Sequence, residues 1–222
     1  MPLREPAVVF DLDGVLLESE PRWTVVETEL FRRYGVTYGQ EHKLQLVGTG
    51  LGGTGTQFES MLDQPGRASE LLEELIELAA EDFARGLDPM PGAVGLVDEL
   101  HGTGRPIAVA SNSFHRLVDV ALDGSALKGS FEVVVSADDV EHPKPAPDLF
   151  LLACSRLGVS PADAVAIEDS APGVSSAKAA GLFVIGIPAV EGVVLDDADV
   201  TATSLESREV REALGLPATS GS

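Results

Sequence analysis

Short apolar runs that recur along the chain constrain its fold more than any other feature of the sequence. They cover residues 7–10, 106–110, 133–135, 164–167 and 183–187. Runs this short, with no alternating polar residues, are typical of strands buried on both faces of a sheet. Stretches typical of helices lie between them, over residues 114–122, 147–157 and 172–180. This alternation predicts an α/β fold with a doubly wound, parallel, Rossmann-like sheet.

One long segment breaks the alternation. Apolar residues recur at helical spacing from Trp23 to Tyr34 and again from Leu72 to Phe83, with no convincing strand between them. Proline and glycine punctuate both ends of this segment. The sequence therefore predicts an inserted helical domain over residues 17–89. The domain predictions also include a core over 1–16 and 90–217 and a flexible tail over 218–222.

The charge of the chain narrows the classes of partner. Fifteen lysines and arginines stand against 36 aspartates and glutamates, which gives a net charge of −21. Such a field repels phosphate backbones and anionic headgroups, so we expect no nucleic acid and no membrane partner. Cys154 is the only cysteine, which fits a reducing compartment. With no signal-peptide pattern and no long apolar segment, these features predict a cytoplasmic protein.

Acidic side chains follow two of the predicted strands. Asp11 and Asp13 follow the first strand, and Glu168 and Asp169 follow the fourth. In open α/β sheets the functional residues lie at the carboxyl ends of the strands, so these carboxylates should converge. A hard divalent cation would relieve their repulsion, and oxygen ligands favour Mg²⁺. The alternative is a solvated acidic loop without metal, because acidic residues are common throughout this chain.

Two further segments could contact an anion at the same edge. Ser111, Asn112 and Ser113 follow the second strand and open the next predicted helix, where backbone N–H groups and a hydroxyl could bind phosphate. Serine and asparagine are also common helix N-caps, which is the alternative interpretation. Lys144 lies between two prolines, which would hold its loop rigid and aim its ammonium at a fixed point.

The order of these segments resembles a known family. Residues 11–15 read DLDGV, residues 111–113 read SNS, residues 144–148 read KPAPD and residues 168–170 read EDS. In this order and spacing they resemble the four motifs of the haloacid dehalogenase superfamily of phosphatases and phosphomutases. Each motif is weak by itself, but the joint match is specific.

The resemblance implies a role for each motif residue. Asp11 would be the nucleophile that attacks phosphorus and forms an aspartyl phosphate, which water then hydrolyses. Asp13 would protonate the leaving alkoxide and later deprotonate the water. Ser111 and Asn112 would bind phosphate, and Lys144 would steady the nucleophile and the transferring phosphoryl group.

The resemblance also implies a Mg²⁺ site. Asp11, Asp169 and the backbone carbonyl of Asp13 would bind the ion, and Glu168 would bind it directly or through water. The dehalogenases that give the superfamily its name lack an acid at the position of Asp13 and need no metal. The presence of Asp13 therefore favours phosphoryl transfer over dehalogenation.

The inserted segment resembles the helical cap of the subfamily that includes phosphoglycolate phosphatases, sugar phosphatases and β-phosphoglucomutase. Caps of this kind close over the site and select substrates. Mutases of the subfamily usually carry a histidine four residues after the position of Ser19, and this chain has Trp23 there. This difference favours a hydrolase over a mutase. His42 could still approach the site from the cap, although a surface position is the alternative.

A glycine-rich stretch of the cap is a candidate for substrate contact. Residues 48–53 read GTGLGG, which fits the dinucleotide pattern GxGxxG, but no strand–helix–strand unit encloses them. We instead expect a flexible loop over 48–55 that faces the substrate. No basic residue occurs between positions 44 and 66, which suits a neutral polyol better than a second phosphate. The cap residues expected to determine specificity are Trp23, Gly48, Thr49 and Thr54.

Together these features predict Mg²⁺-dependent hydrolysis of a small phosphate monoester, with a sugar or polyol phosphate favoured over phosphoglycolate. One alternative is a phosphomutase of the β-phosphoglucomutase type. Another is a non-catalytic protein that binds a phosphorylated metabolite, because fold does not fix function. We expect a monomer, with a homodimer as the alternative.

Overall fold

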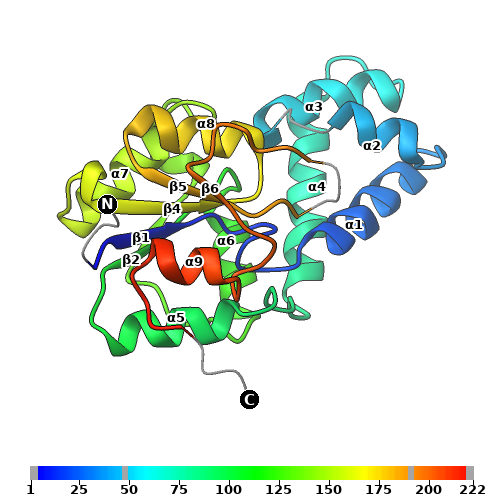
Figure 1. The fold of residues 1–222 in the computed structure, drawn as a ribbon. Coiled ribbons are helices and arrows are strands. Elements are labelled where there is room, and N and C mark those ends of the chain that lie inside the picture. Colours follow the sequence, from blue (N-terminus) through cyan, green and yellow to red (C-terminus); the bar gives the residue numbers. More distant parts are fainter. Residues whose placement is uncertain (1–4, 47–49, 190–192, 219–222) are drawn as a thin grey trace.

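A single parallel sheet organises the protein. The computed structural model describes residues 5–46, 50–189 and 193–218, with residues 50–52 in their backbone only. Within these ranges, six strands lie in the order β3-β2-β1-β4-β5-β6, and every neighbouring pair is parallel (Figure 1). The strands are β1 (Ala7–Phe10), β2 (Ile107–Ala110), β3 (Val133–Val135), β4 (Ala164–Glu168), β5 (Phe183–Gly186) and β6 (Val200–Thr201). The predicted fold class is therefore confirmed.

The predicted strands coincide with the apolar runs because the sheet is covered on both faces. Every residue of β1, β2 and β4 is buried, so neither face of these strands needs polar side chains. The sequence did not reveal β6. That strand has two residues and lies at the edge of the sheet, so it leaves no apolar pattern to detect.

Helices cover both faces of the sheet (Figure 1). On one face the apolar core includes α7 (Asp148–Leu157) and α8 (Ala171–Ala180). On the other it includes α5 (Ala93–Gly102), α6 (His115–Asp123) and α9 (Arg208–Ala213). Two short 3₁₀ turns, η1 (Ala137–Asp139) and η2 (Pro161–Asp163), complete the core. Helices α7 and α8 end at Gly158 and Gly181, whose φ angles of 72° and 90° only glycine adopts readily.

In the described part of the insertion between β1 and α5 there are four helices. They are α1 (Glu20–Arg33), α2 (Gln40–Leu46), α3 (Gly50–Met61) and α4 (Ala68–Phe83). The two linkers to the core run side by side, because the Glu18 N–H donates to the Asp88 carbonyl and the Met90 N–H donates to the Leu16 carbonyl, both at 2.9 Å. The inserted helical cap is as predicted. Its boundaries at residues 17 and 89 stay predictions.

The expectation of a flexible loop over residues 48–55 was wrong for its described part. Residues 50–55 belong to α3, although glycine is a poor helix former. Packing overrides this preference: a Cβ on Gly55 would lie 2.4 Å from the Ala68 carbonyl oxygen, so only glycine lets α3 approach the start of α4 this closely. Gly48 and Thr49 lie outside the described residues.

Helix α4 of the cap packs against α6 of the core. Arg116 on α6 and Glu73 on α4 lie 3.6 Å apart and form the one ion pair between core and cap in the described part of the chain. Near the other ends of these helices, a Cβ on Gly124 would lie 2.9 Å from the Phe83 carbonyl oxygen. The two helices therefore run in the same direction, and this contact joins the cap to the core along the length of α6.

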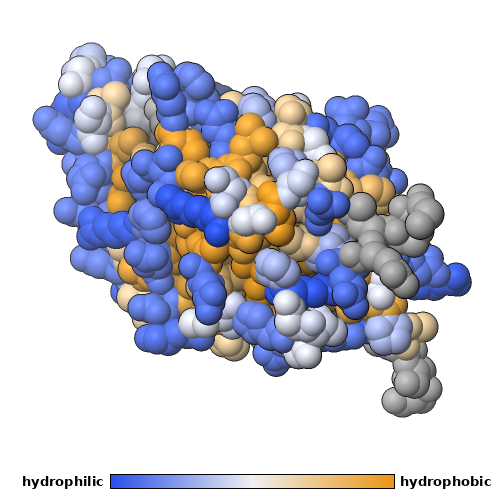
Figure 2. Space-filling view, turned by 90° about the vertical axis from the view of Figure 1, so that its left-hand side faces the viewer, coloured by the Kyte–Doolittle hydropathy of each residue, from blue (hydrophilic) through white to orange (hydrophobic). Residues whose placement is uncertain are grey.

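The face of the core that points away from the cap has a different surface. Figure 2 shows a central group of apolar residues on this face, bordered by hydrophilic ones.

None of the helices described in the structure combines the length and apolar character needed to cross a bilayer. The cytoplasmic location and the monomeric state stay predictions.

Candidate active site

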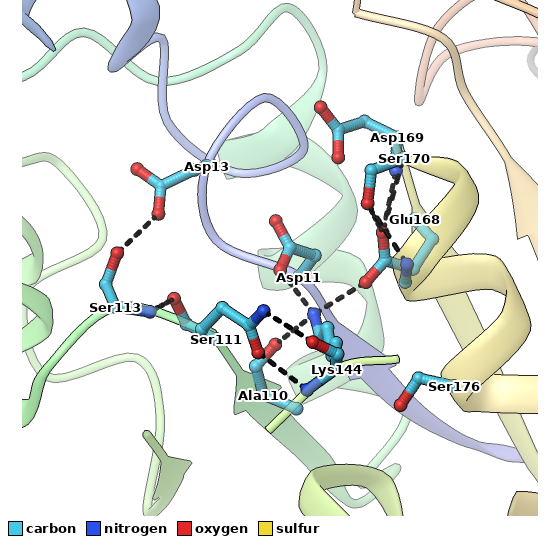
Figure 3. Close-up of polar contacts among 12 residues, drawn as sticks. Asp11, Asp13, Ala110, Ser111, Ser113, Lys144, Glu168, Asp169, Ser170 and Ser176 are labelled. Carbon is cyan, nitrogen blue, oxygen red and sulfur yellow. Dashed lines mark hydrogen bonds and ion pairs between the residues drawn. The ribbon is translucent and has the colours of Figure 1, made fainter. Parts of the chain in front are cut away.

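Polar residues that follow three adjacent strands meet at the carboxyl edge of the sheet (Figure 3). Because β1 lies between β2 and β4, the residues Asp11, Ser111 and Glu168 start from neighbouring strand ends. Lys144 reaches the same point from the loop before α7. All four residues are buried. The convergence expected from the sequence is present.

The Lys144 ammonium holds the centre of the site. Its Nζ donates to Asp11 Oδ1 at 2.5 Å, to Glu168 Oε1 at 2.5 Å and to the Ala110 carbonyl at 2.8 Å, which uses all three of its protons. The Lys144 Nζ also lies over the ring of Phe150, 5.0 Å from its centroid. Burial lowers the pKa of Lys144, but the charges of Asp11 and Glu168 outweigh burial and raise it above its usual value. Lys144 therefore remains a fixed cation.

Asn112 fixes the backbone of Lys144. Its Oδ1 accepts from the Lys144 N–H at 2.9 Å, and its Nδ2 donates to the Lys144 carbonyl at 3.1 Å. The sequence pointed to phosphate binding by Asn112, but its side-chain amide is used to hold the lysine loop. A phosphate contact by Asn112 stays a prediction and would use its backbone N–H.

The turn after β2 is shaped by Ser111. This side chain is 1% exposed, and its Oγ accepts from the Ser113 N–H at 3.0 Å. The triplet 111–113 was expected to open the next helix directly. Instead, α6 begins at His115 after its N-cap, Phe114, so the triplet forms a separate turn. This turn curls the chain at the strand end and aims its hydroxyls at the site.

Two hydroxyls hold Asp13 away from Asp11. The Ser19 Oγ donates to Asp13 Oδ1 at 2.5 Å, and the Ser113 Oγ donates to Asp13 Oδ2 at 3.0 Å. Figure 3 shows the Asp13 carboxylate pointing to Ser113 and not to Asp11. Ser19 belongs to the linker to the cap, whereas Ser113 belongs to the core. Sequence reasoning missed both contacts, and the only signal was the presence of short hydroxyl side chains in the linker and in the turn after β2.

Glu168 is enclosed by protein donors. Its Oε1 accepts from Lys144, and its Oε2 accepts from the Ser170 Oγ at 3.1 Å and the Asp169 N–H at 3.1 Å. A Cβ on Gly173 would lie 2.0 Å from this carboxylate, so glycine is needed for Glu168 to fit. Glu168 therefore positions Lys144. A metal contact of Glu168, direct or through water, stays a prediction.

The site holds an excess of negative charge. Burial raises the pKa of Asp11 well above its usual value, and Lys144 opposes this effect. The three other carboxylates of the site, on Asp13, Glu168 and Asp169, raise it further. For Asp169, burial and then the charge of Glu168 raise the pKa to about 7. One ammonium does not balance four carboxylates, and a cation would relieve the imbalance.

The donors around this charge suit Mg²⁺. A Cβ on Gly14 would lie 2.4 Å from Asp169 Oδ2, so the carboxylate rests against the backbone that follows Asp13. Carboxylate and carbonyl oxygens are the ligands that Mg²⁺ prefers. Within the described residues, no three His, Cys, Asp or Glu side chains are arranged to hold an ion by themselves. A Mg²⁺ ion here would therefore need the Asp13 carbonyl and water as well as Asp11 and Asp169.

Comparison with known proteins identifies the family. Residues 6–181 match the haloacid dehalogenase-like hydrolases. The chain belongs to this family. It is 34% identical over 209 residues to the putative phosphatase YhcW of Bacillus subtilis (strain 168), which covers 92% of this chain and 94% of that protein. It is 31% identical over 184 residues to the fructose-1-phosphate phosphatase YqaB of Escherichia coli (strain K12), which covers 83% of this chain and 97% of that protein.

A solved structure supports the same fold. CbbY from Rhodobacter sphaeroides, in complex with xylulose-1,5-bisphosphate, superposes with a TM-score of 0.80 at 27% identity and covers 90% of this chain and 95% of that one. The predicted family and the predicted enzyme class are therefore confirmed for this haloacid dehalogenase-like hydrolase.

The cap candidates of this hydrolase take part in cap packing. Trp23 lies edge-on against Phe83, with 5.2 Å between ring centroids. His42 Nδ1 accepts from the Gly39 N–H at 3.0 Å, and its ring lies 4.9 Å from that of Phe31. Thr54 is 6% exposed within α3. The contacts described for Trp23 and His42 lie within the cap, and substrate contact by Trp23 or Thr54 stays a prediction.

Proposed function

We propose that this hydrolase is a Mg²⁺-dependent phosphatase that cleaves a small sugar or polyol monophosphate through an aspartyl phosphate. The observation that carries the proposal is the arrangement of two aspartates with different partners. Asp11 is fixed by the Lys144 ammonium at 2.5 Å, whereas Asp13 is held apart by two hydroxyls. This difference supports attack on phosphorus by Asp11 and proton transfer by Asp13.

The first step forms the phosphoenzyme. An oxygen of Asp11 attacks phosphorus, the bond from phosphorus to the ester oxygen breaks, and the leaving alkoxide takes the proton carried by Asp13. Lys144 stabilises the charge on the Asp11 carboxylate and the transferring group. When bound by Asp11, Asp169 and the Asp13 carbonyl, Mg²⁺ would neutralise the charge between the nucleophile and the phosphate.

The second step releases phosphate. Asp13, now ionised, takes a proton from water, the water oxygen bonds to phosphorus, and the bond to Asp11 breaks. The nucleophile is regenerated as a carboxylate beside Lys144. Asp13 ends the cycle protonated, so the same side chain acts as acid and then as base.

The packing of Trp23 favours hydrolysis over the mutase alternative. An indole packed against Phe83 offers no acid or base at the position where the related mutases usually carry a histidine. The alternative of a non-catalytic binding protein is weakened because Asp11, Asp13 and Lys144 are all present and make contacts suited to catalysis.

A panel of phosphorylated metabolites tests the proposal directly. We expect release of inorganic phosphate from sugar and polyol monophosphates with Mg²⁺, loss of this activity in EDTA, and no activity in Asp11→Asn. Formation of an isomer without free phosphate would replace the proposal with the mutase. Binding without turnover of any ester would replace it with the non-catalytic protein.

A further inference from the structure

Every lysine and arginine of the cap is paired with a carboxylate. Residues 17–89 contain six lysines and arginines against fourteen aspartates and glutamates, a net charge of −8. Each of the six cations lies within 4 Å of a carboxylate oxygen. The pairs are Arg22 with Asp82, Arg32 and Arg33 with Glu29, Lys43 with Glu20, Arg67 with Glu70, and Arg85 with Asp82.

In the described part of the core, every lysine and arginine except Arg105 also lies within 4 Å of a carboxylate oxygen. Lys144 shares its protons between Asp11, Glu168 and a carbonyl. Arg105 is the one described arginine or lysine without a carboxylate partner, but it is buried before β2, at the opposite edge of the sheet, and donates to the Leu214 carbonyl. The histidine nearest the phosphate motif, His115, faces carboxylates on α6 and η1 at 3.7 and 3.5 Å.

One of the cap pairs joins α2 to the start of α1, next in sequence to a linker residue that contacts Asp13. Lys43 Nζ lies 2.5 Å from Glu20 Oε1 and donates to the Thr24 Oγ1 at 3.2 Å. Glu20 is the first residue of α1, and the preceding residue, Ser19, donates to Asp13. Glu20 is therefore next in sequence to a residue that hydrogen-bonds Asp13. Glu20 neutralises Lys43, so this pair adds no net positive charge at the start of α1.

We infer that the enzyme selects its substrate by charge: the cap accepts phosphate esters whose leaving group is neutral or cationic, and disfavours those that carry a second phosphate or a carboxylate. This inference rests on the proposed function and specifies its substrate class. Within it, Glu20 is a specificity-determining residue that acts through Lys43.

The physical reason is that the ester's own phosphate uses the charge that the core supplies. A second anion on the leaving group would face a cap with a net charge of −8 and cations already paired. The Glu20–Lys43 pair is partly exposed, and such pairs break at little cost. Rotation of Lys43 would not create a basic site, however, because Glu20 would remain beside it. Repulsion between like charges at a binding surface can decide between partners of equal shape.

Matched esters isolate this effect. Glycerol 3-phosphate and 3-phosphoglycerate differ at a terminal hydroxymethyl or carboxylate. Fructose 1-phosphate and fructose 1,6-bisphosphate differ by one phosphate, and glucose 6-phosphate and glucosamine 6-phosphate differ by an amine. We expect kcat/KM at low salt to be at least about tenfold lower for the anionic member of the first two pairs. We expect kcat/KM for glucosamine 6-phosphate to equal or exceed that for glucose 6-phosphate.

Ionic strength and one substitution test whether charge causes the discrimination between anionic and neutral esters. The discrimination should shrink at high ionic strength, because the Debye length falls from about 10 Å at 0.1 M to about 3 Å at 1 M. Glu20→Gln releases Lys43 and should raise the ratio of anionic to neutral kcat/KM by about threefold or more. Glu212→Gln is the matched control, since it releases Arg208 on α9 from a similar exposed pair and should leave the ratio unchanged.

Hydrolysis of p-nitrophenyl phosphate separates the possible failures. If this ester is hydrolysed but the anionic and neutral members of each pair react equally, the charge selectivity is overturned and the proposed function stands. If Glu20→Gln and Glu212→Gln shift the ratio equally, the role of the Glu20–Lys43 pair is overturned. If no ester releases phosphate, the proposed function itself is overturned, together with the selectivity that rests on it.

Discussion

The candidate site in the core and the surface of the cap hold their charged side chains in different ways. In the core, the side chains of Lys144 and Glu168 are 3% and 0% exposed, and each makes several hydrogen bonds. In the cap, Arg32 and Arg85 form pairs while 71% and 72% of their side chains remain exposed. Buried contacts of the first kind fix atoms in position, whereas exposed pairs contribute only about 0–1 kcal/mol each. The comparison supports our proposals that residues of the core carry out the reaction and that the charge of the cap selects the substrate.

The strongest test of this comparison is removal of the nucleophile from the core. Asparagine is nearly isosteric with aspartate but cannot attack phosphorus, so we expect Asp11→Asn to reduce kcat by at least about a thousandfold. Circular dichroism should show an unchanged fold. Steady-state activity near that of the parent, once contamination is excluded, would rule out the aspartyl phosphate.

The second test removes a proposed metal ligand from the core. We expect Asp169→Asn to weaken Mg²⁺ binding and to lower turnover. Loss of a residue that only supports a metal ligand costs up to about a hundredfold, so loss of a direct ligand should cost at least that much. Calorimetric titration with Mg²⁺ measures the affinity. Equal affinity in the variant and the parent would remove Asp169 from the metal site.

The same residue gives the metal-free protein a pH dependence. The pKa of Asp169 is about 7 in the folded protein and about 3.9 in an unfolded chain. Between these values the folded state binds more protons than the unfolded state, so the free energy of unfolding falls as the pH rises. We expect the Tm in EDTA to fall from about pH 4 to pH 7, and Asp169→Asn to reduce this fall because asparagine carries no charge.

The third test removes in turn the two serines that hydrogen-bond Asp13. Ser113 belongs to the core, and Ser19 belongs to the linker to the cap. A hydrogen bond to a charged group is worth about 1.5–3 kcal/mol, so we expect Ser113→Ala and Ser19→Ala each to lower kcat about tenfold with little change in KM. The loss should be greater for alkyl phosphates than for p-nitrophenyl phosphate in single-turnover phosphoenzyme formation, because an alkoxide needs the proton of Asp13 more. Equal losses for both esters would remove the positioning role. Ser125→Ala, in the turn after α6, is the control.

The smallest expected effect concerns the packing of the cap. A methyl group on Gly55 would lie 2.4 Å from the Ala68 carbonyl oxygen, so we expect Gly55→Ala to destabilise the protein by about 1–3 kcal/mol. In Gly95→Ala, on α5, the added methyl meets open space, and the higher helix propensity of alanine should leave the Tm equal or higher. Thermal unfolding of both variants measures the difference. An unchanged Tm in Gly55→Ala would contradict the close contact between α3 and α4.

Local patterns account for most of what the sequence predicted correctly. The buried strands appear as unbroken apolar runs, and the helices after them end at Gly158 and Gly181. The strand ends predicted that Asp11, Ser111 and Asp169 converge at one edge, and the family resemblance added Lys144. Parallel topology made this possible, because residues at equivalent strand ends must come together.

The features that the sequence did not predict depend on contacts between distant segments. Asn112 binds the backbone of Lys144, 32 positions away, and its residue type alone fits a phosphate ligand equally well. The helix over residues 50–61 contradicts local propensity because α4 packs against it. Strand β6 is too short to carry a pattern.

The sequence by itself determined the alternation of strands and helices, the residues available for catalysis and the excess of negative charge. These properties depend on residue type and on spacing over a few positions, so they can be read along the chain. Only the tertiary structure decided which groups the candidate site residues and Glu20 bind: Glu168 to Lys144, Asp13 to Ser19 and Ser113, and Glu20 to Lys43. A hydrogen bond needs two atoms within about 3 Å, and for Ser113 and Asp13, which are 100 positions apart, only the packing of the whole sheet brings them that close.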